Sequence, residues 1–370
     1  MTFFRPKRTW LYHFILITNG VVSVLLLVSI LASYISPALA WAVALFGIAY
    51  PYILLVNILF VIYWLLVQDK AFLLSLCIIL VGYPQLSNQV RLNFIRKEAL
   101  HPERSFKLLS FNTRLFDLYQ WTNRSDTRHR IFRLLKKEDP NILCIQEFYT
   151  SSTRTGLNNL DSLRQLLKAP FTHSVYTDTR NGTDHWGIAT FSKYPMVRKG
   201  KIFFNEATNN LCIYSDIKIN QDTIRVYNVH FQSNRFRKED YEFLGKPNEH
   251  NGKWIASQNI LNRLKTGSIK RSRQVDLVAD HIEKSPYPVI ICGDFNDPPS
   301  SYTYNRINSQ LKDAFVESGF GLGNTYNGII PLLRIDYILH SPRLSSAGFR
   351  VIEENYSDHF PITCQLELKP

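Results

Sequence analysis

The stretch VIICGDFN, residues 289–296, decides the fold, because it joins a short apolar run to a polar turn. Four consecutive apolar residues are typical of a buried strand. Asp294 and Asn296 flank Phe295, so both polar side chains can face one side while the phenyl ring packs on the other. Alone, a Gly-Asp-x-Asn turn followed by two prolines is equally typical of a structural turn. Its meaning therefore depends on its surroundings.

Four further polar motifs end or follow apolar runs between residues 106 and 361. They are SFNTR (110–114), IQE (145–147), NVHFQ (228–232) and a final pair, RIDYIL (334–339) with SDH (357–359). Polar residues at the ends of buried strands are where a sheet presents a site, since the strand fixes them and the loop exposes them. The amides, carboxylates and imidazoles of these motifs suit a divalent cation of the magnesium type acting on a phosphate ester.

Five such motifs in this order resemble the endonuclease/exonuclease/phosphatase superfamily, which includes pancreatic deoxyribonuclease, neutral sphingomyelinases and inositol-polyphosphate phosphatases. The resemblance covers residues 106–370. It implies a four-layer α/β/β/α sandwich of the deoxyribonuclease I-like type, in which two mixed sheets pack together with helices outside. It also implies a hydrolase that acts on phosphate ester bonds with Mg²⁺ or Mn²⁺ as cofactor.

The resemblance assigns three metal-site residues. Glu147 matches the principal metal ligand, Asn112 sits beside the metal and helps to hold the carboxylates, and Asp358 is a second-site ligand or a water-orienting group. Glu147 ends the run NILCIQ, so a strand would leave its carboxylate pointing out of the end of the sheet. The structural alternatives are a carboxylate paired with a local arginine and, for Asn112, a turn-forming asparagine.

Five residues are predicted to be catalytic: His230, Asp294, Asn296, Asp336 and His359. Asp294 would take the proton of the attacking water or orient it, and Asn296 would hold a phosphate oxygen or Asp294 itself. A carboxylate that accepts one ring N–H of an imidazole fixes its tautomer and raises its pKa, which is the role expected of Asp336 toward His359. His230 would donate to the phosphate during an in-line displacement. A lone strand histidine is otherwise more often a core residue.

The N-terminal region has a different composition, because residues 11–86 are almost uncharged. Its apolar runs cover about 11–35, 38–67 and 71–86, and a helix needs about 20 residues to cross a bilayer core. The first two runs are predicted to be transmembrane helices, whereas the third is short and either spans the membrane or is re-entrant. We therefore expect a membrane region at 1–86 with two or three helices, a basic linker at 87–105 and a catalytic domain at 106–370.

The orientation follows from charges that flank these runs. Arg5, Lys7 and Arg8 precede the first run, and the positive-inside rule places them in the cytoplasm. Arg91, Arg96 and Lys97 follow the third run and favour the same side. If three helices cross, the catalytic domain lies on the far side, which is the periplasmic side of a bacterial inner membrane. We expect an integral membrane protein of this kind.

Alternating strands and helices are expected in the soluble region. Strands are predicted at 106–111, 142–146, 186–191, 210–218, 223–231, 289–292, 335–339 and 362–366. Helices are predicted at 126–137, 160–167, 254–284 with a possible break near Gly267, and 302–310.

The substrate stays open at the level of sequence. A net charge of +13 favours anionic partners, and residues 233–284 interleave basic and aromatic side chains. This pattern fits stacking on single-stranded nucleic acid, a surface that lies on an anionic bilayer, or a solvated basic helix. The predicted function is a membrane-anchored phosphoesterase for a phospholipid headgroup or related ester. The alternatives are a tethered nuclease for DNA or RNA and a catalytically inactive module that binds anionic ligands. Besides that substrate and the lipid bilayer, no obligate protein partner is expected.

Overall fold

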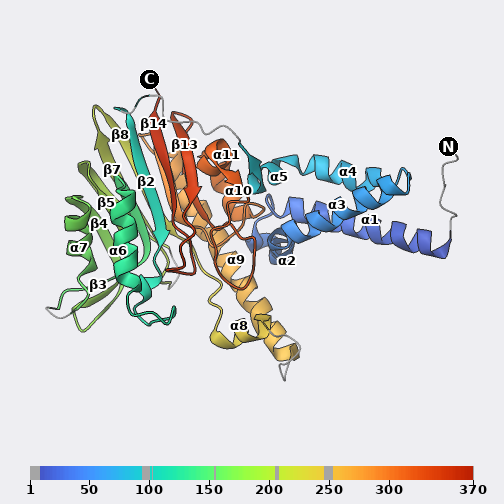
Figure 1. The fold of residues 1–370 in the computed structure, drawn as a ribbon, viewed down its shortest axis with the longest axis horizontal. Helices are drawn as coiled ribbons and strands as arrows, with labels where there is room; N and C mark the ends of the chain where they lie inside the picture. Colours follow the sequence, from blue (N-terminus) through green and yellow to red (C-terminus); the bar gives the residue numbers. More distant parts are fainter. Residues whose placement is uncertain are drawn as a thin grey trace.

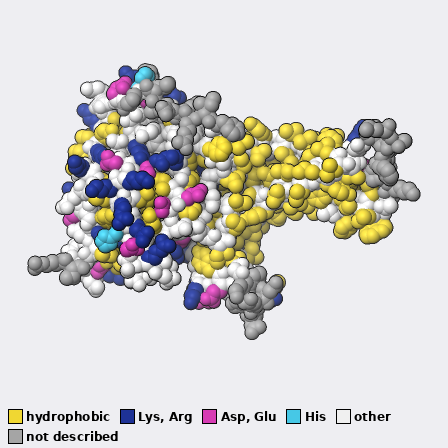
Figure 2. Space-filling model, viewed as in Figure 1, with side chains coloured by type: hydrophobic (Ala, Val, Ile, Leu, Met, Phe, Trp, Pro, Cys, Tyr) yellow, Lys and Arg dark blue, Asp and Glu magenta, His cyan; other side chains and the backbone are white. Residues whose placement is uncertain are grey.

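The computed structural model describes residues 9–93, 101, 103–153, 156–204, 208–245 and 253–369. Within them, a bundle of apolar helices projects from one side of a layered α/β body (Figure 1). The bundle consists of α1 Trp10–Leu31, α2 Pro37–Ile48, α3 Tyr50–Leu66, α4 Phe72–Val81 and α5 Tyr83–Gln89. Hydrophobic side chains cover the visible face of this bundle, whereas lysine and arginine side chains spread over the body (Figure 2).

In the described part of the chain, α1 is the one helix that is long and apolar enough to cross a membrane. Two bent pairs, α2–α3 at 53° and α4–α5 at 71°, meet the same criterion only if each pair is one broken span or a re-entrant loop. Pro51 and Pro84 lie in the first turns of α3 and α5, where a missing N–H is tolerated. The predicted runs 38–67 and 71–86 are therefore each two helices separated by a bend.

Polar side chains inside the bundle connect its helices. Ser75 Oγ donates to Asn19 Oδ1 over 2.6 Å, and Ser23 Oγ donates to Asn57 Oδ1 over 3.3 Å. The Asn57 amide in turn donates to the carbonyl oxygen of Val22. Since these side chains are buried among apolar helices, their hydrogen bonds specify how α1, α3 and α4 pack.

Two six-stranded mixed sheets pack face to face in the body. The first sheet has the order β13-β14-β2-β3-β5-β4 and the second has the order β10-β12-β9-β8-β7-β6. The first consists of β2 Ser105–Asn112, β3 Ile142–Ser151, β4 Phe171–Arg180, β5 Asp184–Ser192, β13 Leu344–Val351 and β14 Ile362–Leu368. The second consists of β6 Met196–Ile202, β7 Leu211–Ile219, β8 Asp222–His230, β9 Val289–Asp294, β10 Lys312–Asp313 and β12 Asp336–His340.

Helices cover the outer face of each sheet, which gives four layers (Figure 1). Helices α6 Thr127–Glu138 and α7 Asn159–Leu166 pack on the first sheet, while α9 Lys253–Glu283 and α10 Tyr302–Asn308 pack on the second. Alternation along β2 makes this possible, because Leu108 faces the other sheet and Leu109 faces α6. The predicted α/β/β/α sandwich is confirmed.

All eight predicted strands and all four predicted helices are present, with differences in detail. The three longest strands that the sequence did not reveal, β4, β6 and β13, lie at sheet edges, where one side is less apolar and periodicity is weak. The possible break near Gly267 is wrong, because α9 runs through it. A Cβ on Gly267 would lie 2.6 Å from Asn234 Oδ1, so glycine there permits close packing on a neighbouring loop.

The bundle is bonded to the body. Ser300 Oγ donates to the carbonyl oxygen of Gly47 over 2.7 Å, and a Cβ on Gly47 would lie 2.8 Å from the Ser300 carbonyl oxygen. The Tyr52 hydroxyl donates to the carbonyl oxygen of Pro331 over 2.9 Å. Contacts this close hold α2 and α3 against loops of the body.

The predicted linker at 87–105 begins inside ordered structure. Helix α5 extends to Gln89, and β1 Arg91–Leu92 pairs with β11 Phe320–Gly321. The buried Arg334 donates from Nη2 to the carbonyl oxygen of Asn88 over 2.8 Å. The linker residues 94–100 and 102 lie outside the described residues, as do the predicted orientation signals Arg5, Lys7, Arg8, Arg96 and Lys97.

Candidate active site

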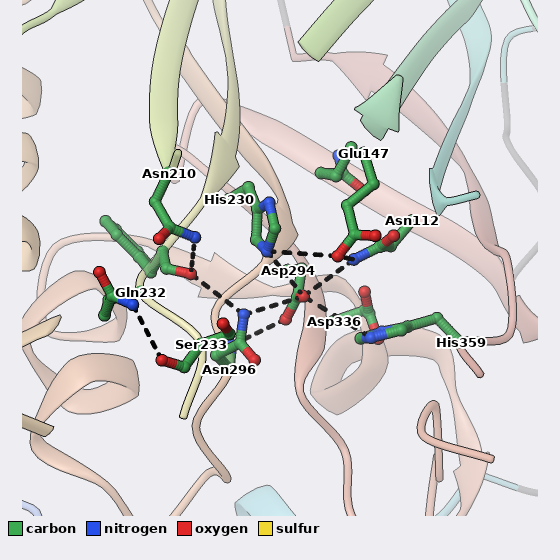
Figure 3. Close-up of polar contacts among 12 residues, drawn as sticks. Asn112, Glu147, Asn210, His230, Gln232, Ser233, Asp294, Asn296, Asp336 and His359 are labelled. Atoms are coloured by element: carbon green, nitrogen blue, oxygen red, sulfur yellow. Dashed lines mark hydrogen bonds and ion pairs between the residues drawn. The ribbon is translucent and has the colours of Figure 1, made fainter. Parts of the chain in front are cut away.

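The predicted site residues gather at one end of the two sheets (Figure 3). Strand β8 ends at His230 and β9 ends at Asp294, and these parallel neighbours pair the two residues directly. Strand β12 runs antiparallel to β9 and pairs Asp336 with Asp294. The register therefore places His230, Asp294 and Asp336 in one row across three strands of the second sheet.

His359 and Asp336 form the predicted pair. His359 Nδ1 lies 2.9 Å from Asp336 Oδ2, and its Nε2 lies 3.7 Å from Asp294 Oδ2. Burial would lower the pKa of His359, but the charges of Asp336 and Asp294 outweigh it and raise this pKa well above its ordinary value. The ring is therefore an imidazolium at neutral pH, with Nε2 directed at the centre of the site.

These same three residues are close enough to hold a metal ion, since their ligand atoms lie within 4.8 Å of one another. The raised pKa of His359 favours an arrangement without a metal ion among these three residues. A protonated imidazole already places a positive charge between the two carboxylates, so the group is satisfied as an ion triplet.

His230 differs from His359 in its protonation. Its Nε2 lies 3.5 Å from Asp294 Oδ2 and 3.9 Å from Glu147 Oε1. Burial lowers the pKa of His230 more than the Asp294 charge raises it. Among the described residues, this buried Nε2 has no hydrogen-bond partner. A neutral ring with an unpaired nitrogen facing the site is suited to bind a substrate oxygen.

Asp294 and Asn296 form a tight turn at the end of β9. The Asn296 backbone N–H donates to Asp294 Oδ1 over 2.8 Å, and its amide donates to Asp294 Oδ2 over 2.9 Å. Burial, with the Asp336 charge, raises the pKa of Asp294 to about 6. Phe295 packs in the core behind the turn, as predicted. The preceding Gly293 has φ +138°, and a side chain there would collide with the Val229 carbonyl.

Glu147 lies inside its strand, so the prediction that it ends the strand is wrong. Strand β3 continues to Ser151, and its register with β5 shifts between Ile145 and Phe148. Glu147 occupies this bulge with φ +47°. A bulge turns a side chain that would otherwise follow the alternation of the strand. The Glu147 side chain is 34% exposed and faces the site.

Asn112 holds two carboxylates, in agreement with what the resemblance implied. Its amide nitrogen lies 3.4 Å from Glu147 Oε1 and 3.1 Å from Asp294 Oδ2. Its oxygen accepts a hydrogen bond from the backbone N–H of Arg114. Asn112 therefore connects the first sheet to the row of residues on the second.

A left-handed turn follows Asn112, in the 3₁₀ segment Arg114–Asp117. All four residues have positive φ, between 46° and 60°, which costs roughly 1–2 kcal/mol for each. The turn places Arg114 Nε 3.4 Å from Asp358 Oδ2 and its guanidinium over the Trp121 ring. No glycine or asparagine signals this turn, so sequence reasoning quoted Arg114 within a motif and missed its role.

Glu147, Asp358 and Asn112 are the predicted metal-site residues, and their chemistry fits a hard divalent cation. Burial and the charge of Asp358 together raise the pKa of Glu147. Two carboxylates that repel each other at an open end of the sheets gain from a cation between them. The residues present therefore fit Mg²⁺ or Mn²⁺.

A cavity of about 330 Å³ opens beside Glu147 and His230. Arg180 and Trp186 form part of its wall, and the guanidinium lies 5.0 Å from the centre of the indole ring. Arg235 and Asn209 also line the cavity. A cavity of this size with cationic, amide and aromatic walls suits a polar group attached to the reacting phosphate.

Two buried residues that were only neighbours of predicted ones join the sheets behind the site. Gln146 Nε2 donates to Asn228 Oδ1 over 2.7 Å, and Asn228 Nδ2 donates to the carbonyl oxygen of Ala189 over 2.9 Å. Both side chains are buried. Their position within the motifs IQE and NVHFQ was the available signal.

Two tyrosines were also missed. The Tyr326 ring packs edge-on against His359, with centroids 5.7 Å apart, and its backbone bridges to that residue. Burial raises the pKa of the Tyr326 hydroxyl, and the neighbouring Tyr241, which belongs to α8 Lys238–Gly245, raises this pKa further. No motif marks Tyr326, and the basic and aromatic stretch 233–284, to which Tyr241 belongs, did not predict that it lies beside the site.

Comparisons with known proteins agree with this geometry. A model described as the endonuclease/exonuclease/phosphatase family matches residues 109–359, and one described as a domain of unknown function matches residues 12–89. The chain matches none of the curated proteins with which it was compared.

Solved structures share the fold at low identity. An endonuclease/exonuclease/phosphatase from Bacteroides vulgatus has a TM-score of 0.52 at 17% identity and covers 72% of this chain and 99% of its own. A family protein from Bacteroides thetaiotaomicron has a TM-score of 0.50 at 19% identity, with 72% and 95% covered. One from Beutenbergia cavernae DSM 12333 has a TM-score of 0.50 at 16% identity, with 72% of each chain covered.

Proposed function

Because this chain belongs to the endonuclease/exonuclease/phosphatase family, we propose that it is a membrane-anchored, divalent-metal-dependent phosphoesterase that hydrolyses a phospholipid headgroup or a related phosphate ester. The helices of the bundle anchor it, and the catalytic domain lies on the periplasmic side of a bacterial inner membrane. Family membership supports the reaction class, while the bundle and the cavity support the substrate class.

Glu147 and Asp358 hold the cation in this proposal, with Asn112 beside them. A bound Mg²⁺ or Mn²⁺ supplies polarisation of the phosphoryl oxygen and stabilises the charge that develops on it. The Asn112 amide keeps the Glu147 and Asp294 carboxylates in place through the hydrogen bonds described above.

The chain's own residues carry the water attack. Asp294 accepts a proton from water, since a carboxyl whose pKa is raised to about 6 is a useful base near neutral pH. Asn296 fixes the Asp294 carboxylate through two donors. The protonated His359 and the neutral His230 both present Nε2 to the phosphoryl group and stabilise its negative charge. The water oxygen bonds to phosphorus as the ester oxygen leaves on the opposite side.

The observation that carries the lipid assignment is the bonded contact between bundle and body. Ser300 lies four positions after Asn296, and its hydroxyl is hydrogen-bonded to Gly47 of α2. A site held this close to apolar helices remains near the surface in which those helices lie. A headgroup is the phosphate ester that such a surface presents in greatest number.

The test is a substrate panel with the full chain reconstituted in vesicles. Phospholipids, DNA, RNA and inositol phosphates are assayed with and without Mg²⁺, with His359→Asn as the inactive control. We expect metal-dependent release of headgroup or phosphate from lipid. Salt-sensitive cleavage of DNA or RNA alone would establish the nuclease alternative instead. Turnover of no substrate would support the inactive binding module.

A further inference from the structure

Helix α9 connects the catalytic loops to the membrane side of the molecule. Its C-terminal half contains Arg271, whose side chain is fully buried. Arg271 Nη1 donates to the carbonyl oxygen of Gln232 over 2.7 Å, and its Nη2 donates to Asp297 Oδ1 over 2.9 Å. The Gln232 backbone N–H donates to Gln274 Oε1 on the same helix. This half therefore fixes the loops that follow His230 and Asp294.

The N-terminal half of α9 leaves the body beside α2 and extends past it (Figure 1). Lys265 Nζ lies 5.1 Å from the centre of the Trp41 ring of α2. Leu261 and Trp254 lie four and eleven positions earlier, which places them on the same face of the helix as Lys265. Leu261 is 40% exposed and Trp254 is 74% exposed. The face that contacts the bundle thus continues outward as an exposed apolar face with a lysine on it.

The other side of this half is covered. Ile260 is buried, and Arg263 Nε lies 2.8 Å from Asp240 Oδ2 of α8. Helix α8 therefore packs on the side of α9 that faces away from Trp254 and Leu261. In the described part of the chain these two helices form a hairpin with one packed and one exposed side.

Helix α8 also reaches the catalytic centre. The hydroxyl of Tyr241 on α8 interacts with that of Tyr326, since each affects the pKa of the other, and the Tyr326 ring packs against His359. Burial raises the pKa of the Tyr241 hydroxyl, and the charges of Asp358 and Glu147 raise this pKa further. The hairpin is therefore a wall of the active site on one side and an exposed apolar face on the other.

We propose that the α8–α9 hairpin docks on an anionic lipid bilayer through the Trp254, Leu261 and Lys265 face of α9, a contact additional to the membrane helices. This inference rests on the membrane anchoring in the proposed function. Three observations favour a bilayer as the occupant. The face is continuous with the apolar bundle, it carries a tryptophan of the kind enriched at membrane interfaces, and it carries a lysine for anionic headgroups. Docking would hold the Tyr241 wall of the site at the lipid surface.

The first test measures where this face lies. Cys77 is the exposed cysteine, and the other four cysteines are buried, so spin labels are introduced in a Cys77→Ser background. Gln258→Cys places a label between Trp254 and Leu261. Asn259→Cys is the matched control, since Asn259 is exposed on the side that lines a cavity with Arg235.

Accessibility to oxygen and to a water-soluble nickel chelate is measured for the full chain in nanodiscs of phosphatidylcholine and phosphatidylglycerol. We expect a higher oxygen-to-nickel ratio at position 258 than at position 259. Equal ratios would overturn the proposal. Spin–spin broadening at 258 in nanodiscs that hold two copies would identify a second copy as the occupant and would also overturn it.

The second test measures the consequence for turnover. Leu261→Glu places a charge on the proposed face, and Leu277→Glu is its control because Leu277 lies on the same helix with a similar exposure of 39%. We expect Leu261→Glu to slow hydrolysis of vesicle phospholipid about tenfold, with no change on soluble bis(p-nitrophenyl) phosphate. Leu277→Glu should change neither. Equal effects of the two variants on vesicles would contradict docking by this face. If the unsubstituted chain hydrolyses no lipid, the proposed function fails while the label experiment still decides the docking.

Discussion

His230 and His359 both lie beside the Asp294 carboxylate, yet they carry different charges. His359 is held by two carboxylates and is protonated, whereas His230 is buried without a bonded anion and is neutral. The difference arises from Asp336, which bonds the ring of His359. In the proposed function, His359 therefore supplies a full positive charge to the phosphoryl group, and His230 supplies a neutral donor.

His359→Ala should lower turnover by about 10²- to 10⁴-fold, because it removes a positioned charge and donor. Asp336→Asn should reproduce much of this loss. The double variant should fall little below His359→Ala, since two residues that act as a unit are far from additive. The measurement is kcat for the four proteins on one substrate. Losses that multiply would show that the residues act independently.

Glu147→Gln should weaken Mn²⁺ binding by at least about tenfold, because a neutral amide replaces one of the two carboxylates, Glu147 and Asp358, that hold the cation in the proposed function. Isothermal titration of the reconstituted chain measures the affinity. The control is Glu353→Gln, an exposed carboxylate away from the site, which should leave affinity unchanged. Chelation should also abolish hydrolysis, and added Mg²⁺ or Mn²⁺ should restore it. Full activity in excess chelator would remove the metal from the mechanism.

At the level of elements, buried polar side chains fix one sheet against the other. Asn228 on β8 accepts from Gln146 on β3 and donates to β5, directly behind the site. Hydrogen bonds have directions that apolar packing lacks, so this cluster sets how the sheets align. The alignment matters because Asn112 and Glu147 come from one sheet and Asp294 from the other.

Asn228→Ala should therefore lower the free energy of unfolding by about 1–3 kcal/mol, since it removes buried hydrogen bonds to the Gln146 amide and the Ala189 carbonyl. Thermal unfolding followed by circular dichroism measures it. Asn327→Ala removes an exposed amide that bonds Asn355 and serves as the control, with an expected change within about 0.5 kcal/mol. Similar shifts for both variants would mean that the tie between the sheets contributes little.

Helix α11 Ala314–Ser318 is tied to two strands through Glu317. Glu317 Oε2 lies 2.9 Å from Nε2 of His340 on β12. It also accepts hydrogen bonds from the backbone N–H and the hydroxyl of Ser346 on β13. Partial burial alone would raise the pKa of Glu317, but these donors outweigh it and lower the pKa to about 2. The carboxylate is thus stabilised in the folded state.

The sign of the pH effect follows from this lowered pKa. The contribution of Glu317 to stability is complete above its unfolded pKa near 4.5 and is lost as the pH falls toward 2. Glu317→Gln should reduce the loss of stability between these two values. Denaturant titrations of both proteins at about pH 5, 4 and 3 measure this loss of stability. If the free energies of unfolding of the two proteins differ by the same amount at each pH, Glu317 does not titrate in this range.

The strands and the residues at their ends could be predicted from sequence, because apolar runs followed by polar motifs report both. Glu147 was predicted as a site residue but at a strand end, since a bulge leaves no mark in the alternation of IQEFY. The positions of Tyr326 and Tyr241 could not be predicted, because tertiary packing alone brings Tyr326 to His359 and α8, with Tyr241, toward Tyr326. The break predicted at Gly267 failed since glycine there serves packing.

At the scale of the whole molecule, the bundle and the body carry opposite surface chemistry and are bonded together (Figure 2). The side of the membrane on which the body lies then depends on how many times the bundle crosses. Helix α1 alone is long and apolar enough to cross a membrane, and each of the two bent pairs could cross only as a broken span. An odd number of crossings separates the N-terminal basic residues from the catalytic domain.

Reporter fusions at Lys70 and at Pro370 measure this topology. If α4 and α5 together cross the membrane, Lys70 reports the cytoplasm and Pro370 reports the far side, because the third crossing separates them. We expect this outcome. A fusion within the first apolar run, at Gly20, controls for reporters that fail to insert. The same compartment at Lys70 and Pro370 would refute three crossings and would make intracellular nucleic acid an accessible substrate.

The hydrogen bond from Arg334 to Asn88 sets a limit on how the chain can be divided for preparation. A fragment that begins at Ser105 would keep every predicted catalytic residue, yet it would lack the carbonyl that receives this buried guanidinium and the strand that pairs with β11. Arg334 would keep its partner Asp313 and lose its second acceptor inside the protein. The α/β body is therefore not independent of the residues before Ser105, and fragments for crystallisation or screening should start no later than Tyr83.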